Sequence, residues 1–322
     1  MARYLVTGAA GFIGSSLVRA LLNRGETVRG IDNLSTGHLE NIADIQDRFD
    51  FRVADVLDKG AVAEASESID YVLHQAAIAS VPRSISDPVS SHDANITGTL
   101  NVLLAARDAG VKRVVFASSS SIYGESPTLP KHEDMLPDPI SPYAVSKLAG
   151  EMYMKSFYRV YGLETVSLRY FNVFGPRQDA SSQYSGVLAK FITMMLHGER
   201  PAVFGDGGQS RDFNYIDNTV QANLLACTAP AAKVAGLAFN VATGTRVTLN
   251  ETYRLLQKLT GYDQDPTYGE ERAGDIRHSL ADVALARESF GYDPKVGFEE
   301  GLRKTVEWYR TQVFDTASDR RG

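Results

Sequence analysis

The sequence predicts an α/β fold in which a doubly wound parallel sheet is followed by a smaller mixed α/β lobe. Short apolar runs alternate with helix-length segments from residue 3 to about residue 170. A turn with regularly spaced glycines joins the first apolar run to the first of these segments. Beyond residue 170 the alternation stops, and shorter elements with more glycine and proline follow. These observations predict a Rossmann-type domain over residues 1–170 and a ligand-binding lobe over residues 171–322, with some of the chain crossing back.

The composition is that of a globular protein and narrows the range of partners. The chain has 322 residues, of which 43% are hydrophobic and 22% are charged. Its net charge of -6 argues against nucleic acid and anionic membranes as partners, because both favour a basic surface. A single cysteine, Cys227, excludes an internal disulfide and a cysteine metal cluster. With no basic leader and no apolar run of membrane-spanning length, we expect a cytoplasmic protein without membrane contact or a bound metal.

The first strand and helix are expected to surround a phosphate-binding turn. Residues 3–7 form an apolar run, and Gly8, Gly11 and Gly14 follow at once. Glycines here allow a tight turn, close approach of a pyrophosphate and close packing of a helix whose N-terminus favours an anion. The second strand, residues 28–32, ends on Asp32, where a carboxylate can accept a hydrogen bond from an adenosine ribose. Because Asp32 would repel a 2′-phosphate, the pattern favours NAD as the cofactor.

The next elements continue the alternation and predict further parallel strands. The strands are residues 51–55 and 71–75, and the helices are residues 59–66 and 93–108. Asp55 ends the third strand at the sheet edge where ligands of such sheets bind, so that it either contacts the adenine or is a surface turn acid. His74 is interpreted as a packed strand-end residue, because no second ligand stands at metal spacing.

A fifth strand and a long helix are expected to carry a proton-transfer site. The strand, residues 113–117, runs into the serines 118–121. Tyr143 and Lys147 are four residues apart, so a helix opened by Pro142 would present both on one face. A tyrosine phenol titrates near about 10, and a neighbouring ammonium favours the phenolate. The apolar outer faces of this helix and of the 93–108 helix also predict a homodimer built from two helices per subunit.

Arginines in the second part of the chain indicate a site for a phosphorylated ligand. Arg211 and Arg272 both stand in glycine-containing loops. Guanidinium groups bind phosphate oxygens through paired hydrogen bonds, so two such loops can form a clamp. The alternative is that each arginine is simply exposed to solvent. Two helices are expected late in the chain, over residues 249–259 and 299–309.

Taken together, these residues resemble the extended short-chain dehydrogenase/reductase superfamily over nearly the whole chain. The resemblance implies NAD in the first domain and a nucleotide sugar, a UDP-sugar, in the second. It implies that Ser119, Tyr143 and Lys147 are the catalytic residues. The implied cofactor contacts are Gly8, Gly11, Phe12, Ile13, Gly14, Asp32, Asn33, Asp55, Val56, Ala76, Ala77, Asn95, Tyr143 and Lys147. The implied substrate contacts are Ser80, Ser119, Ser120, Tyr143, Asn172, Gln178, Val187, Val203, Phe204, Arg211, Arg272, Asp275 and Ser279.

The residues after Ser119 distinguish the reactions of this superfamily. Related sugar-nucleotide dehydratases carry an Asp-Glu pair there, and decarboxylating relatives carry a glutamate, whereas this chain has Ser120 and Ser121. The resemblance therefore implies a 4-epimerase, in which Tyr143 takes the proton of the sugar 4-hydroxyl while hydride passes from C4 to NAD. The sugar then turns about its diphosphate, and hydride returns to its other face.

Two positions suggest which sugar is bound. Asn172 is similar to hexose and N-acetylhexosamine epimerases, whereas hexuronate epimerases commonly have threonine there. Ser279 stands where strictly UDP-glucose-specific enzymes carry a tyrosine, so its small side chain leaves room for a 2-N-acetyl group. The pattern is most similar to bacterial UDP-N-acetylglucosamine 4-epimerases. The alternatives are a UDP-glucose or UDP-glucuronate 4-epimerase, a dehydratase or decarboxylase, and a non-catalytic NAD-binding regulator.

Overall fold

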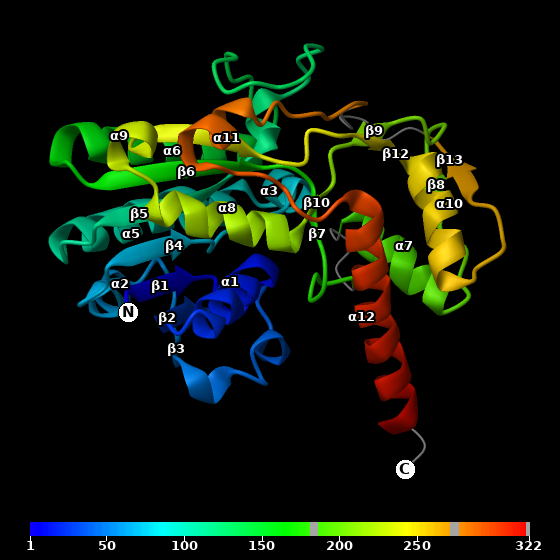
Figure 1. The fold of residues 1–322 in the computed structure, drawn as a ribbon, viewed down its shortest axis with the longest axis horizontal. Coiled ribbons are helices and arrows are strands. Elements are labelled where there is room, and N and C mark those ends of the chain that lie inside the picture. Colours follow the sequence, from blue (N-terminus) through cyan, green and yellow to red (C-terminus); the bar gives the residue numbers. More distant parts are fainter. Residues whose placement is uncertain (181–185, 271–276, 320–322) are drawn as a thin grey trace.

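A seven-stranded parallel sheet forms the centre of the molecule, which we describe from a computed structural model covering residues 1–180, 186–270 and 277–319. The strand order is β11-β6-β5-β4-β1-β2-β3, and every neighbouring pair is parallel (Figure 1). The strands are β1 (Arg3–Thr7), β2 (Thr27–Asp32), β3 (Asp50–Val53), β4 (Tyr71–His74), β5 (Arg113–Ser119), β6 (Glu164–Tyr170) and β11 (Leu237–Val241). The predicted doubly wound parallel sheet is thus confirmed.

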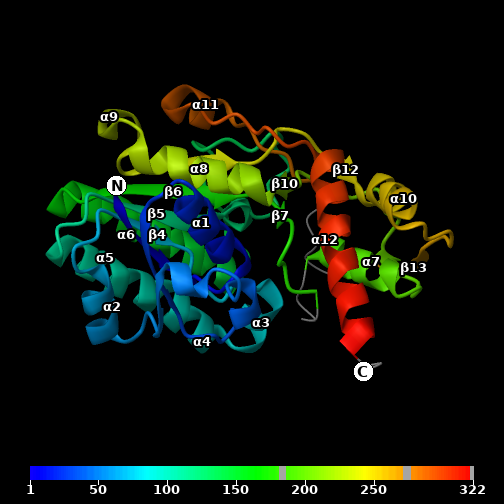
Figure 2. The ribbon, with the colours of Figure 1, turned by 60° about the horizontal axis from the view of Figure 1, so that its bottom comes forward.

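Helices cover both faces of this sheet. Consecutive residues of β5 show this, because Val115 packs into one apolar core and Val114 into another. The helices of the first core are α1 (Phe12–Asn23), α8 (Ile216–Thr228), α9 (Ala231–Val234) and α11 (Ala284–Phe290), and those of the second are α2 (Lys59–Ser66), α5 (Gly98–Asp108) and α6 (Pro142–Tyr161). Figure 2 shows α8 and α2 on opposite sides of the sheet. Strands that are buried on both faces read as continuous apolar runs, as they do here.

The prediction of one regular helix over residues 93–108 is wrong, because the helical run begins earlier and is not regular. Two short helices precede it, α3 (Val81–Ser86) and α4 (Pro88–His92), and a π-helical turn, η3 (Asp93–Thr97), leads into α5. The earlier start has a local cause: the Asp87 side chain accepts a hydrogen bond from Ser90 N, and Pro88 occupies the first turn of α4. A π turn adds a residue within a helical run and is frequent at functional sites.

The long helix α6 begins at Pro142, as the sequence predicts. Ser141 caps its N-terminus by accepting a hydrogen bond from Ala144 N, and Pro142 fills the first turn. Gly162 ends it in a left-handed conformation, with φ at 71°. Ahead of α6, β5 passes into a short 3-10 turn, η4 (Ser120–Tyr123). The carboxyl end of β5 and the N-terminus of α6 are therefore held close together.

The second part of the chain builds a smaller mixed α/β unit around a third apolar core, which includes Phe174, Phe191, Tyr253 and Leu302. Its helices gather at one end of the molecule (Figure 1): α7 (Val187–Leu196), α10 (Leu249–Thr260) and α12 (Phe298–Asp319). Its strands pair as β7 (Val173–Phe174) with β10 (Asn214–Tyr215), β8 (Ala202–Phe204) with β13 (Thr267–Gly269), and β9 (Ser210–Arg211) with β12 (Val247–Thr248).

Membrane-spanning helices are absent from the part of the chain that the structure describes, since none of its helices combines sufficient length with sufficient apolar character.

Candidate active site

The main cavity, of about 720 Å³, lies along the carboxyl edge of the sheet. This is the edge at which open α/β sheets bind their ligands. Nearly all of the predicted cofactor contacts line it: Gly8, Gly11, Phe12, Ile13, Gly14, Asp32, Asn33, Asp55, Val56, Ala76, Ala77, Tyr143 and Lys147. Of the predicted substrate contacts, Ser80 and Gln178 line it as well.

The glycine turn leaves no room for side chains and exposes a helix end to the cavity. Gly8 has a φ of 70°, and a Cβ on it would lie 2.8 Å from Ala76 N. A Cβ on Gly14 would lie 1.9 Å from the Gly8 carbonyl oxygen, so glycine is required there for α1 to approach the turn. The N-terminus of α1 receives no hydrogen bond from a capping side chain. Its amides and partial positive charge therefore suit a pyrophosphate.

Acidic and amide side chains form the wall at the end of β2. Asp32 is buried, and its carboxylate accepts hydrogen bonds from Ala10 N at 2.9 Å and Leu34 N at 2.8 Å. Burial raises the pKa of Asp32, and these backbone donors act against the rise. Asn33 donates to the Asp55 carboxylate at 2.8 Å, which fixes a second polar edge. These residues fit the sugar and base of a dinucleotide such as NAD.

The structure brings Ser119, Tyr143 and Lys147 close together, and Tyr143 and Lys147 line the cavity. Lys147 Nζ donates to the Ala117 carbonyl oxygen at 2.8 Å and lies 5.9 Å from the centre of the Tyr143 ring. Burial lowers the pKa of Lys147 to about 7. Burial also raises the pKa of Tyr143, and a hydrogen bond with Ser119 acts against this rise. The arrangement can hold a hydroxyl group and transfer its proton.

Ser119 is the last residue of β5. Its Oγ accepts a hydrogen bond from Ser121 N at 3.2 Å, which starts the η4 turn. Ser118 and Ala117, the residues before it, line the cavity, although Ser119 itself is not among the lining residues. Ser120 is half-buried within the same turn. Ser118 is thus the residue of the serine run that lines the cavity, and Ser119 follows it directly.

Asn95, expected to contact the cofactor, lies behind the cavity wall. It is buried in the π turn, and its side chain accepts from Ile78 N at 2.8 Å and donates to Ser146 Oγ at 3.0 Å. Ser146 Oγ in turn donates to the Tyr143 carbonyl oxygen at 2.7 Å. Asn95 therefore supports the first turn of α6 and uses its amide for that purpose.

His74 is packed in the interior, as the sequence predicts. It lies between the hydroxyls of Thr7, at 2.7 Å, and Thr99, at 3.0 Å. Burial lowers the pKa of His74 to about 3, so the ring is neutral at physiological pH. In residues 1–180, 186–270 and 277–319 the structure shows no group of three His, Cys, Asp or Glu side chains suited to a metal ion.

Sequence reasoning missed several polar residues of the cavity wall, among them Gln75 and Tyr170. Tyr170 OH donates to the Gln75 side chain at 3.2 Å and to Asn223 at 3.0 Å. Both follow or end strands at the carboxyl edge, β4 and β6, and this position was the available signal. Asn223 comes from α8, more than fifty residues later, and carries no comparable signal.

The remaining predicted substrate contacts lie around β8, β9 and the start of α7. Asn172 donates to the Asp212 carbonyl oxygen at 3.2 Å, and Val187 begins α7. Arg211 donates to the backbone of Ser210 at 3.0 Å, and Ser279 N donates to the same carbonyl. Val203 is buried in β8, whereas the neighbouring Phe204 is 37% exposed. Arg272 and Asp275 lie outside the described residues.

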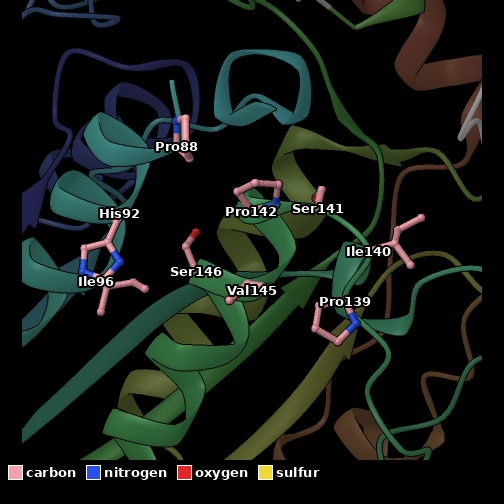
Figure 3. A pocket seen from close by; sticks show the side chains of 9 residues that line it. All are labelled: Pro88, His92, Ile96, Pro139, Ile140, Ser141, Pro142, Val145 and Ser146. Atoms are coloured by element: carbon pink, nitrogen blue, oxygen red, sulfur yellow. The ribbon is translucent and has the colours of Figure 1, made fainter. Parts of the chain in front are cut away.

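A second hollow, of about 410 Å³, opens on the outer surface beside the start of α6 (Figure 3). It is lined by none of the predicted site residues. Its walls come from α4, η3, the loop before α6 and α6 itself: Pro88, His92, Ile96, Pro139, Ile140, Ser141, Pro142, Val145 and Ser146. Apolar side chains predominate among these residues.

Comparisons with known proteins agree with this geometry. The model of the NAD dependent epimerase/dehydratase family matches residues 4–242. UDP-glucose 4-epimerase of Mycolicibacterium smegmatis is 41% identical over 316 residues, covering 96% of this chain and 99% of that protein. Among solved structures, UDP-glucose 4-epimerase of Thermotoga maritima with UDP-glucose has a TM-score of 0.92 at 41% identity, covering 97% of this chain and 99% of that one. UDP-N-acetylglucosamine 4-epimerase of Methanobrevibacter ruminantium, in complex with UDP-N-acetylmuramic acid, gives the same TM-score of 0.92, the same 41% identity and the same coverages of 97% and 99%.

Proposed function

The chain belongs to the NAD dependent epimerase/dehydratase family, and from this premise we propose that it is a UDP-sugar 4-epimerase acting on UDP-N-acetylglucosamine and UDP-N-acetylgalactosamine. One observation carries the proposal: Tyr143, which is hydrogen-bonded to Ser119, and Lys147 line the same cavity as the glycine turn and Asp32. A proton-transfer set and a dinucleotide site in one cavity are what reversible oxidation of a hydroxyl group requires.

The residues of the chain would divide the work as follows. Tyr143 takes the proton from the sugar 4-hydroxyl and later returns it, while Ser119 holds the substrate oxygen by a hydrogen bond. Lys147, as an ammonium, stabilises the Tyr143 phenolate electrostatically. NAD, when bound, supplies the hydride acceptor and donor for C4, so the sugar passes through a 4-keto form. The glycine turn, Asp32 and Asn33 would hold the cofactor.

The residues beside Ser119 support epimerisation over elimination of water. Ser120 and Ser121 form the η4 turn, so this turn provides hydroxyls where a dehydratase needs a carboxylic acid and a carboxylate. Epimerisation needs hydride transfer and one proton shuttle only, and Tyr143 can serve as that shuttle.

Ser279 supports an N-acetylated sugar. It is half-buried, and its backbone is held by the Ser210 carbonyl oxygen beside Arg211. A serine at this position leaves space for the 2-N-acetyl group that a tyrosine would fill. The substrate discrimination of a pocket by shape alone is about 10-fold to 200-fold.

A Ser279→Tyr variant is therefore expected to lose about 10-fold to 200-fold in kcat/KM for UDP-N-acetylglucosamine while retaining turnover of UDP-glucose. Both constants are measured by NMR of the sugar anomeric protons. Ser279→Ala, which keeps the small volume, should leave both constants close to those of the unaltered protein. Equal losses for the two sugars would contradict the role given to Ser279.

The second candidate is a UDP-glucose 4-epimerase, because relatives with 41% identity over nearly the whole chain carry that name. A third, a UDP-glucuronate 4-epimerase, is disfavoured by Asn172 as noted above. Incubation of the purified protein, without added NAD, with each of the three UDP-sugars tests them together. Formation of UDP-N-acetylgalactosamine, resolved by anion-exchange chromatography or NMR, supports the proposal. Conversion of UDP-glucose alone keeps the mechanism and refutes the N-acetylated substrate.

We also propose that the protein is a homodimer that associates through α5 and α6. Val145 is 49% exposed and Met152 is 50% exposed on α6, and they are seven residues apart, which places them on one face. Leu100 and Leu104 are half-buried on the neighbouring α5. Light scattering after gel filtration is expected to give twice the 35.1 kDa chain mass, and Met152→Glu is expected to shift it toward the monomer. A monomer in the unaltered protein would contradict the dimer.

A further inference from the structure

A buried ion pair lies directly behind the serine run and is not used by the mechanism above. Glu151, on α6, and Arg169, on β6, have side chains only 3% and 6% exposed. Arg169 binds both carboxylate oxygens, with its Nε at 3.0 Å and its Nη2 at 2.9 Å. Such paired hydrogen bonds fix the relative orientation of the two groups.

We infer that Glu151 and Arg169 are positioning residues that hold the end of β5 at the correct distance from α6, and so place Ser119 against Tyr143. The inference rests on the proposed epimerase reaction. Neither residue lines the main cavity, so their effect must pass through the groups that they hold.

Ser118 connects the ion pair to the end of β5. Ser118 Oγ donates to a Glu151 carboxylate oxygen at 2.5 Å. Ser118 precedes Ser119 and is also the register partner of Arg169 in the sheet. The ion pair therefore contacts the end of β5 from two sides, from α6 and from β6.

Glu151 belongs to a series of evenly spaced side chains along α6. Tyr143, Lys147 and Glu151 follow one another at intervals of four residues and share one face of the helix. Lys147 holds the Ala117 carbonyl oxygen, and Glu151 holds the Ser118 hydroxyl. Two consecutive residues of β5 are thus attached to consecutive turns of α6, and the next residue, Ser119, is the one that meets Tyr143.

Arg169 extends this attachment to the loop beyond the serines. Its Nη1 donates to Tyr123 OH at 2.8 Å and to the Glu133 carbonyl oxygen at 3.1 Å. Tyr123 belongs to η4, the turn that starts at Ser120, and its hydroxyl donates to Asn240 at 2.7 Å. The backbone on both sides of Ser119 is therefore fixed by the same ion pair.

Stability alone gives little reason to retain such a pair. Buried ion pairs can often be replaced by apolar residues of similar volume without loss of stability, although removing one partner is strongly destabilising. Replacing both partners can therefore restore the stability of the protein without restoring the position of Ser119, so that the two effects can be measured separately. Strands β5 and β6 also provide a control ion pair at their opposite end. There Arg113 and Glu164 form an ion pair and are register partners, as Ser118 and Arg169 are at the end beside the serines.

The test compares Glu151→Gln, Ser118→Ala and the double variant Glu151→Leu/Arg169→Met. We expect all three to lower kcat by about 10-fold to 100-fold, since a small misplacement of reacting groups has effects of that size. KM and bound NAD should stay within about twofold in the two Glu151 variants, because neither Glu151 nor Arg169 lines the main cavity. The double variant should recover the thermal midpoint lost in Glu151→Gln without recovering kcat, whereas Arg113→Met/Glu164→Leu should keep full kcat.

Recovery of kcat together with the thermal midpoint in the double variant, or an equal loss in the Arg113/Glu164 control, would overturn the inference. Ser118→Ala keeps the ion pair, so it remains informative if Glu151→Gln fails to fold.

A measurement without turnover separates this inference from the proposed reaction. In the double variant, which leaves no uncompensated charge, displacement of Ser119 removes the hydrogen bond that acts against the effect of burial, so the pKa of Tyr143 should rise relative to the unaltered protein. The pKa is followed by NMR of ¹³C-labelled tyrosine with NAD bound, and Tyr143→Phe identifies the signal. Arg113→Met/Glu164→Leu, which leaves the contacts of Ser118 intact, should titrate like the unaltered protein. A protein that turns over no sugar but shows this shift refutes the reaction only, whereas an unshifted Tyr143 refutes the inference.

Discussion

Replacement of Tyr143 by phenylalanine is expected to lower kcat for 4-epimerisation by about 10³-fold, within the range of 10²-fold to 10⁴-fold for the loss of a general acid-base group. The substitution removes one hydroxyl and leaves the ring, so α6 should keep its packing. Binding of the UDP-sugar and of NAD should change little, because the lost group acts on the proton that moves in the transition state. Single-turnover measurements of sugar oxidation would show the effect directly.

Tyr158→Phe is the matched control for this prediction, since Tyr158 lies on the same helix and is 38% exposed on the outer surface. It should retain full activity. If Tyr143→Phe turned over UDP-sugars at the normal rate, Tyr143 would not be the proton carrier, and another residue would have to transfer the proton.

Replacement of Lys147 by methionine is expected to reduce kcat by about 10²-fold or more and, at the same time, to stabilise the cofactor-free protein. Lys147 is buried and has the Ala117 carbonyl oxygen as a hydrogen-bond acceptor, with the Phe116 ring 5.0 Å from its Nζ. An ammonium held in this way costs folding free energy that a methionine of similar volume does not. A gain of about 1–4 kcal/mol in the free energy of unfolding is the scale expected for such exchanges.

The pH dependence of this gain follows from the direction of the shift. Burial lowers the pKa of Lys147 to about 7, below its ordinary value near 10.5 in the unfolded chain. Below pH 7 the folded protein holds a buried charge, so the destabilisation is fully present; between about pH 7 and pH 10 the folded state releases the proton first and the destabilisation fades. The gain from Lys147→Met should therefore be largest near pH 6 and small near pH 10.

Urea unfolding at both pH values measures this difference. The exposed Lys155→Met on the same helix should show no such trend. A gain for Lys147→Met that does not depend on pH would contradict the assigned cause.

The sequence allowed much of this site to be predicted because its signals are local. The ends of α6 follow from Ser141, Pro142 and Gly162, which act within one turn of the backbone. The strand ends at Asp32 and at the serine run follow from apolar runs bounded by polar residues. These elements carry most of the predicted cofactor and catalytic residues.

The parts that could not be predicted depend on contacts between distant segments. Nothing in residues 93–108 signals a π turn, so Asn95 could not be assigned to the support of α6 from its position in a regular helix. The pairing of Ser210 with His278, and the bond between Tyr170 and Asn223, join segments more than fifty residues apart. Glu151 lies at helical spacing from Lys147, yet only its burial against Arg169 reveals what it holds.

The return of β11, α8 and α11 to the large sheet has a consequence for synthesis of the chain. Phe239 and Phe290 belong to the same apolar core as Leu17 on α1, which leaves the ribosome more than two hundred residues earlier. Domains usually fold one after another as they emerge. Here the NAD-binding sheet lacks an edge strand and part of its cover until about residue 290 has been made. This apolar core therefore cannot be completed until most of the chain has been synthesised.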